Sequence, residues 1–134
     1  MINLRIITPT GTYLVQSVDY LEVCAPHSVL GILPGHAPLI STLLIGLLKT
    51  KVGAKTNYYA AGEGVIHIKK DETIVMVSSI EKCDEIDIDR AIEAKKRAEQ
   101  RLQKAKDDTD VDIARAESAL SRALNRIKVY NEHK

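Results

Sequence analysis

The segment Ile86-Asp87-Ile88-Asp89-Arg90-Ala91 stands where the chain changes from one kind of sequence to another. All seven glycines and all four prolines lie at or before Gly64, and the remainder of the chain is rich in charged residues. Gly and Pro mark turns, whereas a long charged stretch without them favours helix. We therefore expect two unlike domains, one over residues 1–84 and one over residues 85–134.

Length and charge limit what the chain can be. At 134 residues it can build one modest hydrophobic core and an appendage, but not two large domains. Of the 37 charged residues (19 Lys and Arg plus 18 Asp and Glu), 24 follow Cys83, and they are 12 acidic and 12 basic. A net charge of +1 and a balanced tail argue against a nucleic-acid-binding protein, which would carry a basic stripe.

The sequence lacks the signatures of metal sites, membrane helices and nucleotide hydrolysis. Cys24 and Cys83 have no metal-ligand spacing and no apolar signal segment opens the chain, so we expect buried free thiols in a cytosolic setting. The most apolar run, Leu39 to Leu48, has about half of the ~20 residues that a membrane helix needs. Because no phosphate-binding Gly-x-x-x-x-Gly-Lys-Ser/Thr loop is present, we expect no catalytic residues and no enzyme activity of its own.

The first domain has the patterns of short β-strands. Apolar and polar residues alternate at 4–6, 20–23 and 66–69, which predicts strands with one wet face. The segment Thr73 to Ile80 has apolar groups on both faces, as expected of a strand inside a sandwich or barrel. Turn signals separate these segments at Thr8-Pro9-Thr10-Gly11, Leu33-Pro34-Gly35-His36, Val52-Gly53 and Lys70-Asp71-Glu72. We expect an all-β sandwich.

The second domain has the period of helices. Small apolar residues form one stripe at Ala91, Ala94, Ala98, Leu102 and Ala105 and another at Ala116, Ala119, Ala123, Ile127 and Tyr130. The break at Asp107-Asp108-Thr109-Asp110 predicts an α-helical hairpin of two antiparallel helices. Asp87 is placed to cap the first helix, and Thr109 with Asp112 resembles a capping box for the second. Alanine buries little apolar area, so we expect a weak hairpin that can open.

The arginines of the second domain fall on common helix faces. Arg90 and Arg97 are seven residues apart, and Arg122 and Arg126 are four apart. Folding the hairpin at its break sets Arg126 opposite Arg90 and Arg122 near Arg97. Four guanidinium groups on one surface would repel one another unless an anion or carboxylates lie among them.

Two interpretations of this arginine cluster stay open from spacing alone. One is a solvated helix face with intrahelical partners such as Glu93. The other is a polyphosphate site, for which planar and permanently charged guanidinium groups are well suited.

Three motifs taken together resemble one family, the epsilon subunits of F-type ATP synthases. They are Gly31-Ile32-Leu33-Pro34-Gly35-His36-Ala37-Pro38, the junction segment Ile86-Asp87-Ile88-Asp89-Arg90-Ala91, and Ala116-Glu117 with Ala123-Leu124-Asn125-Arg126. The motifs occur in the family's order and cover essentially the whole chain. Each is moderately specific, and their combination with a sandwich followed by a hairpin is highly specific.

The resemblance implies a non-catalytic subunit of the central rotor stalk, which couples proton flow to ATP synthesis. In the family the sandwich binds the gamma subunit and sits on the ring of c subunits, at the cytoplasmic face of the plasma membrane. The helices change between a folded hairpin and an extended form. When extended, they reach the catalytic alpha and beta subunits and inhibit ATP hydrolysis. No nucleic-acid partner and no obligatory cofactor are implied.

The resemblance also implies a binding site for ATP as an effector, with or without Mg²⁺. The family's I/L-D-x-x-R-A motif and further binding positions, carried over by alignment, give Glu81, Ile86, Asp87, Arg90, Ala91, Arg97, Arg122 and Arg126. ATP phosphates would neutralise the arginines and keep the hairpin folded. Asp87 has a simpler alternative role as an N-cap alone, and the alternative for the whole chain is a structural rotor subunit without physiological ATP binding.

The chain departs from the family pattern in two places. Many members carry Ser-Gly-Gly-Phe where this chain has Ala61-Gly62-Glu63-Gly64-Val65, and this chain contains no Phe. His27-Ser28-Val29-Leu30 replaces a more usual polar, acidic approach to the Gly-Ile-Leu-Pro-Gly-His loop. The changes at Glu63 and at the apolar Val29-Leu30 pair are expected to alter contacts, in a direction that the sequence leaves open.

Overall fold

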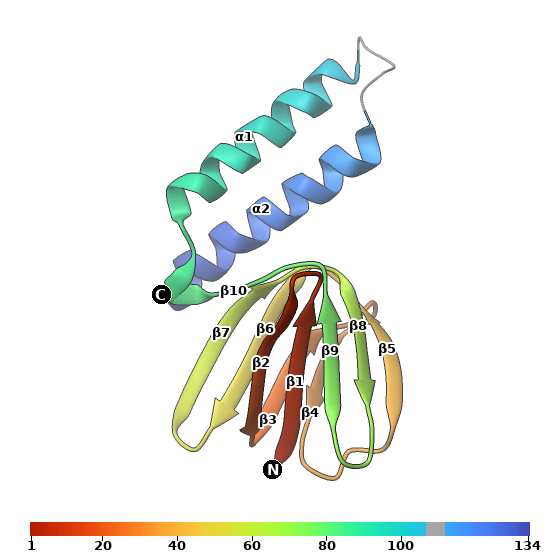
Figure 1. Cartoon of the computed structure of the whole chain (residues 1–134). Helices are drawn as coiled ribbons and strands as arrows, with labels where there is room; N and C mark the ends of the chain where they lie inside the picture. Colours follow the sequence, from red (N-terminus) through yellow and green to blue (C-terminus); the bar gives the residue numbers. More distant parts are fainter. Residues whose placement is uncertain (107–111) are drawn as a thin grey trace.

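A computed structural model of the protein describes residues 1–106 and 112–134. It contains a β-sandwich followed by two antiparallel helices, which confirms the predicted fold class. Figure 1 shows the helical hairpin projecting from one end of the sandwich, next to β7 and β10, with the N-terminus at the opposite end.

The first sheet of the sandwich has the strand order β2-β1-β9-β8-β5. Its neighbours pair antiparallel except β1 with β9, which run parallel. The strands in that order are Gly11–Val18, Ile2–Thr8, Thr73–Val77, Gly64–Ile68 and Leu39–Leu43.

The second sheet has the strand order β10-β7-β6-β3-β4, and all of its pairs are antiparallel. The strands in that order are Ile80–Lys82, Lys55–Ala61, Gly46–Val52, Tyr20–Cys24 and Val29–Ile32. The core between the two sheets consists mainly of aliphatic side chains that point inward from alternate positions of the strands, such as Leu4, Ile6, Leu21 and Ile66.

The segment Thr73 to Ile80 is not one strand, so that part of the prediction was wrong. Strand β9 ends at Val77, and β10 begins at Ile80 in the other sheet. The two serines between them carry the chain from one sheet to the other, a crossing that a run of similar residues cannot reveal. The inner position Val75 is fully buried, whereas Met76 on the outer face is 44% exposed.

Both helices begin at an aspartate. Helix α1 spans Ile88–Lys104 and α2 spans Ile113–His133, and a short 3-10 helix, η1 (Cys83–Glu85), connects β10 to α1. The Asp87 carboxylate accepts a 3.1 Å hydrogen bond from the Arg90 amide, as predicted. Asp112 itself caps α2, and the predicted partner Thr109 lies outside the described residues. No helix in the described ranges is long and apolar enough to cross a membrane.

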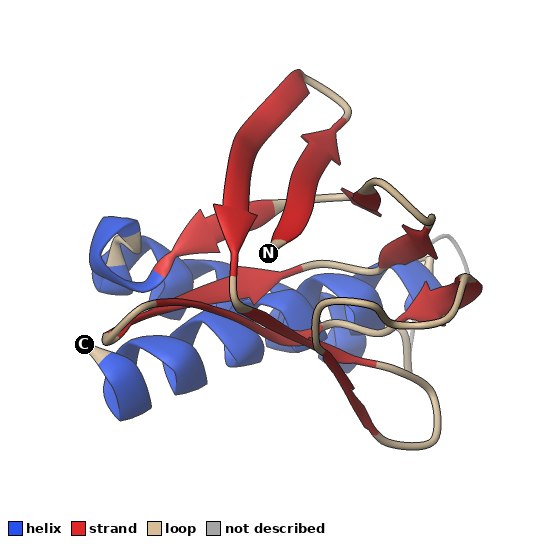
Figure 2. Ribbon diagram, turned by 90° about the horizontal axis from the view of Figure 1, so that it is seen from below, coloured by secondary structure: helices blue, strands red, loops and turns tan. Residues whose placement is uncertain are grey.

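The helices contact each other along the alanine seam. Figure 2 shows them side by side along their length. Four seam positions are 0–1% exposed, and these are Ala91, Ala98, Ala116 and Ala123. The other stripe positions are only partly buried. Methyl side chains allow a close approach of the backbones but bury far less apolar area than leucines would. The seam therefore fits tightly and contributes little stability.

A larger side chain in the seam should separate the helices. Ala98→Leu inserts three carbons where no space exists, so we expect a loss of about 1–3 kcal/mol in the free energy of unfolding of the helical part. Ala114→Leu on the exposed side of α2 is the matched control and should be neutral. Urea denaturation followed by circular dichroism at 222 nm measures both. Equal stability of the two variants would contradict the tight seam.

Candidate functional site between the hairpin and the sandwich

A second, small apolar cluster attaches the hairpin to the sandwich. It contains Ala60 from β7, Cys83 from η1, Ile86 from the junction and Val129 from α2, all at most 6% exposed. Leu47, Tyr58 and Tyr130 cover it. Val129 lies off the predicted alanine stripe, because α2 uses one face for α1 and another for the sandwich. The sequence analysis missed it.

Aromatic and sulfur contacts complete this attachment. The ring of His133, at the end of α2, stacks on Tyr58 with centroids 3.9 Å apart and planes at 8°. The Cys83 Sγ lies 3.8 Å from the Val129 carbonyl oxygen, which it faces as a weak donor. Burial, and then the nearby Asp84 carboxylate, raises the pKa of the Cys83 thiol. The thiol therefore stays protonated and poorly reactive while the helix covers it.

Polar contacts from one face of α2 add to the attachment. Asn125 Nδ2 donates to the Gly46 carbonyl at 2.9 Å and lies 3.4 Å from the Ala61 carbonyl. The next residue, Arg126, pairs through its Nε with Glu81 Oε1 on β10 at 2.9 Å. Both partners of this ion pair are partly exposed, so its contribution is at most about 1 kcal/mol.

The 3-10 helix at the junction is tied to the first sheet. The Tyr13 hydroxyl on β2 donates to Glu85 Oε2 at 3.3 Å. Burial, and then the charge of Glu85, raises the pKa of Tyr13 to about 12. Tyr13 therefore remains a hydrogen-bond donor to Glu85 at neutral and moderately alkaline pH.

A cavity of about 530 Å³ lies where β10, η1, α1 and α2 meet. This volume falls within the range of small-molecule sites. Its lining consists of charged groups around two alanines and comprises Glu81, Glu85, Asp87, Arg90, Ala91, Ala94, Arg97 and Arg126. The cavity exists only while the hairpin is docked, because its walls come from both domains.

The cavity combines cations and carboxylates. Three arginines and three carboxylates line it, so the formal charge of the lining is zero. Arg126 pairs with Glu81, whereas no carboxylate within residues 1–106 and 112–134 forms an ion pair with Arg90 or Arg97. Such a site offers guanidinium donors for an anion and carboxylate acceptors for hydroxyl or amino groups.

The structure brings together six of the eight residues that the resemblance indicated. Glu81, Asp87, Arg90, Ala91, Arg97 and Arg126 line the cavity. Ile86 lies in the apolar cluster and is 5% exposed. Arg122 does not line the cavity, because its Nη1 pairs with Glu63 Oε1 at 3.0 Å. The hairpin thus sets Arg126 near Arg90 and Arg97, as expected, but turns Arg122 toward the sandwich.

Sequence reasoning placed the carboxylates of Glu81 and Asp87 in the site but missed those of Glu63 and Glu85. Glu93, the suggested intrahelical partner, makes no ion pair among the described residues. The partners of Arg122 and Arg126 come instead from Glu63 and Glu81 on the sandwich. Glu85, beside the I/L-D-x-x-R-A segment, also reaches the cavity. The position of Glu85 immediately before that segment was the one feature of the sequence that could have indicated its place in the cavity.

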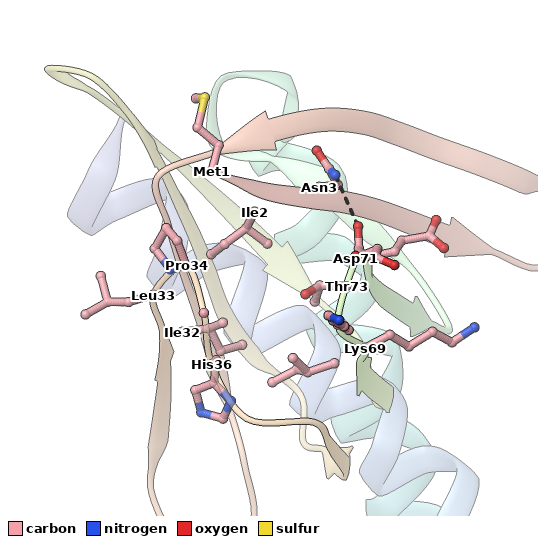
Figure 3. A pocket seen from close by; sticks show the side chains of 14 residues that line it. Met1, Ile2, Asn3, Ile32, Leu33, Pro34, His36, Lys69, Asp71 and Thr73 are labelled. Atoms are coloured by element: carbon pink, nitrogen blue, oxygen red, sulfur yellow. Dashed lines mark hydrogen bonds between the residues drawn. The ribbon is translucent and has the colours of Figure 1, made fainter.

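A second cavity, of about 270 Å³, lies at the far end of the sandwich between the N-terminus and two loops. Figure 3 shows Met1, Pro34, His36 and Lys69 around it and a 3.1 Å hydrogen bond from Asn3 Nδ2 to the Asp71 carbonyl. Loop residues form much of its wall. No cluster of three His, Cys, Asp or Glu residues that could hold a metal occurs in the part of the chain that the structure describes.

Two family models match the chain and divide it where the structure changes from sheet to helix. Residues 1–83 match the β-sandwich domain of the ATP synthase delta/epsilon chain, and residues 84–131 match its long α-helix domain. Together the two models cover nearly all of the sequence.

Curated relatives and solved structures agree with the family models. The ATP synthase epsilon chain of Bacillus cytotoxicus is 43% identical over 126 residues, covering 94% of this chain and 93% of that protein. The epsilon chain of Nitratidesulfovibrio vulgaris is 41% identical over 128 residues, covering 96% and 94%. A chain of the Euglena gracilis mitochondrial ATP synthase has the same fold, with a TM-score of 0.78, 22% identity and coverage of 92% of this chain and 78% of that one.

Apolar packing, more than the ion pair, should hold the hairpin on the sandwich. Val129→Ala removes two buried carbons, so we expect a loss of about 2 kcal/mol in the free energy of unfolding at any ionic strength. Glu81→Gln should cost less than about 1 kcal/mol, and 1 M NaCl should abolish the difference. Urea titrations at low and high salt test both. A larger loss of stability for Glu81→Gln than for Val129→Ala would show that the ion pair contributes more than the apolar packing.

Proposed function

Because this chain belongs to the ATP synthase delta/epsilon family, we propose that it is a non-catalytic subunit of the central rotor stalk of an F-type ATP synthase. In this role it helps couple proton flow to ATP synthesis and has no catalytic site of its own. Its place is the F1 sector, at the cytoplasmic face of the plasma membrane. Relatives at about 40% identity, named as ATP synthase epsilon chains, support the assignment.

The sandwich is proposed to contact the gamma subunit and the ring of c subunits. Support comes from the solved assemblies that contain the same fold, one described as OSCP, F1 and the c-ring and another as the central stalk and c-ring. The helices are proposed to extend toward the alpha and beta subunits and to inhibit ATP hydrolysis when they leave the sandwich. The small area of the second apolar cluster makes such a release possible.

ATP is proposed to bind the cavity as an effector that is not consumed. The observation that carries this proposal is the convergence of Arg90, Arg97 and Arg126 from two helices on one cavity of about 530 Å³. Guanidinium groups match phosphate geometry, while Glu81 and Asp87 can accept hydrogen bonds from the base or the sugar.

Binding at this place would stabilise the folded hairpin. The ligand contacts β10, α1 and α2 together, so it binds the docked state and not the open one. At a concentration one hundred times its dissociation constant, such a ligand stabilises the docked state by about 2.7 kcal/mol. That amount exceeds the contribution of an exposed ion pair, so a fall in ATP would release the helices.

Titration of the purified protein with ATP, with and without Mg²⁺, tests the proposal. We expect saturable heat, and we expect Asp87→Ala to weaken binding at least tenfold because Asp87 lines the cavity. Asp112→Ala is the matched control, since Asp112 caps α2 as Asp87 caps α1. Each loses about 1 kcal/mol of cap stabilisation, but only Asp87 faces the ligand.

Equal effects of the two substitutions would return Asp87 to the role of an N-cap alone. An absence of heat and of thermal stabilisation up to millimolar ATP would favour the second candidate, a rotor subunit with a structural role and no physiological ATP binding. The zero formal charge of the cavity lining is the observation that favours this second candidate, because a neutral site attracts a polyphosphate weakly.

A further inference from the structure

We propose that Glu63 acts as a built-in competitor of the effector, because it holds Arg122 away from the cavity in the ligand-free protein. Its carboxylate is the ion-pair partner of Arg122 in the ligand-free protein, whereas a phosphate of the ligand would be the partner of Arg122 in the cavity. The same ion pair fastens α2 to the sandwich. This inference rests on the proposed ATP site and adds a residue that sets its affinity.

The loop that carries Glu63 is held rigidly. The Gly62 amide donates to the Ser79 carbonyl at 2.8 Å, and the Ser78 amide donates to the Glu63 carbonyl at 2.9 Å. A Cβ at Gly62 would overlap with the Ser78 Oγ, and one at Gly64 would overlap with the Met76 carbonyl oxygen. Both flanking positions therefore require glycine, and the turn between β7 and β8 presents Glu63 to α2 in a defined place.

Arg122 is positioned to serve either partner. It lies one turn before Arg126 on the same face of α2, and Asn125 fixes the backbone of that turn through its bond to Gly46. The Arg122 side chain is 29% exposed and meets Glu63 through Nη1, so rotation about its side-chain bonds can release it without moving the helix. Arg126 contacts both the cavity and the small hollow in which Arg122 lies.

The position of the Arg122 side chain determines the net charge of the cavity. The cavity lining sums to zero, from three arginines and three carboxylates. Bringing Arg122 into the cavity makes the sum +1, which favours a polyphosphate. Leaving Arg122 on Glu63 keeps the cavity neutral and lowers the affinity for anions. The Arg122–Glu63 ion pair must therefore break before Arg122 can bind the ligand, and the free energy needed to break it lowers the affinity.

Removal of the Glu63 carboxylate should strengthen the binding of ATP and weaken the attachment of the hairpin to the sandwich. Without Glu63 the effector should bind more tightly, because Arg122 is free to reach it. Without Glu63 the ligand-free hairpin should also open more often, because one contact to the sandwich is lost. A residue that merely packs in the turn would produce neither effect.

Glu63→Gln tests the competition with ATP as the probe. We expect calorimetric titration to show binding about two- to fivefold tighter than for the unmodified protein, the range that a partly exposed ion pair allows. Glu72→Gln is the matched control, since Glu72 pairs with Arg5 at 3.0 Å on the first sheet, away from the hairpin. Unchanged or weaker binding by Glu63→Gln, when the unmodified protein binds ATP, would overturn the proposal.

Labelling of Cys83 with a thiol reagent tests the attachment without any nucleotide. Cys83 is 6% exposed beneath α2, so in a Cys24→Ser background its reaction rate reports how often the hairpin opens. We expect Glu63→Gln to speed labelling about two- to fivefold and Glu72→Gln to leave it unchanged. Equal rates would overturn the role of Glu63 in the attachment.

The two measurements separate the failure of this inference from the failure of the proposed function. If neither the unmodified protein nor Glu63→Gln binds ATP, the effector site and the competition are both overturned, and the labelling rates still decide the attachment. If both proteins bind ATP equally, the effector site stands and the competition alone is overturned.

Discussion

The small apolar contact between α2 and the second sheet is the interaction on which the functional part of the molecule depends. Val129, Cys83, Ile86 and Ala60 bring the hairpin to the sandwich, and the charged cavity exists only because they do so. The contact is much smaller than the sandwich core, so docking is the weakest step in the folding hierarchy. The proposed release of the hairpin would therefore leave the sheets folded.

Charge gives this weak contact its sensitivity. The arginines of the hairpin meet carboxylates of the sandwich, and partly exposed pairs such as Arg126 with Glu81 contribute too little to fix the docked state. A polyanion that gathers several arginines at once can supply more stabilisation than any single pair. In the proposed mechanism Glu63 moderates that response, because it gives Arg122 an ion-pair partner within the protein. The weak packing and the division of opposite charges between hairpin and sandwich are the two properties that the proposed switch requires.

The sequence allowed prediction of those features that depend on local pattern. Alternating residues indicated the sandwich, Asp87 marked the start of α1, and the alanine stripes indicated the seam. Contacts between residues that are far apart in the sequence could not be predicted in this way. The burial of Val129 and the pairing of Arg122 with Glu63 depend on how the hairpin lies on the sheets, which no periodicity encodes.

The most direct test of the account is the distance between the hairpin and the sandwich with and without ATP. Spin labels at exposed positions Lys55 and Ser121, in a protein with Cys24 and Cys83 replaced by alanine, would be measured by double electron–electron resonance. The account predicts one narrow distance distribution at saturating ATP and an added population of different distances without it. The same distribution under both conditions would contradict the claim that ATP holds the hairpin on the sandwich.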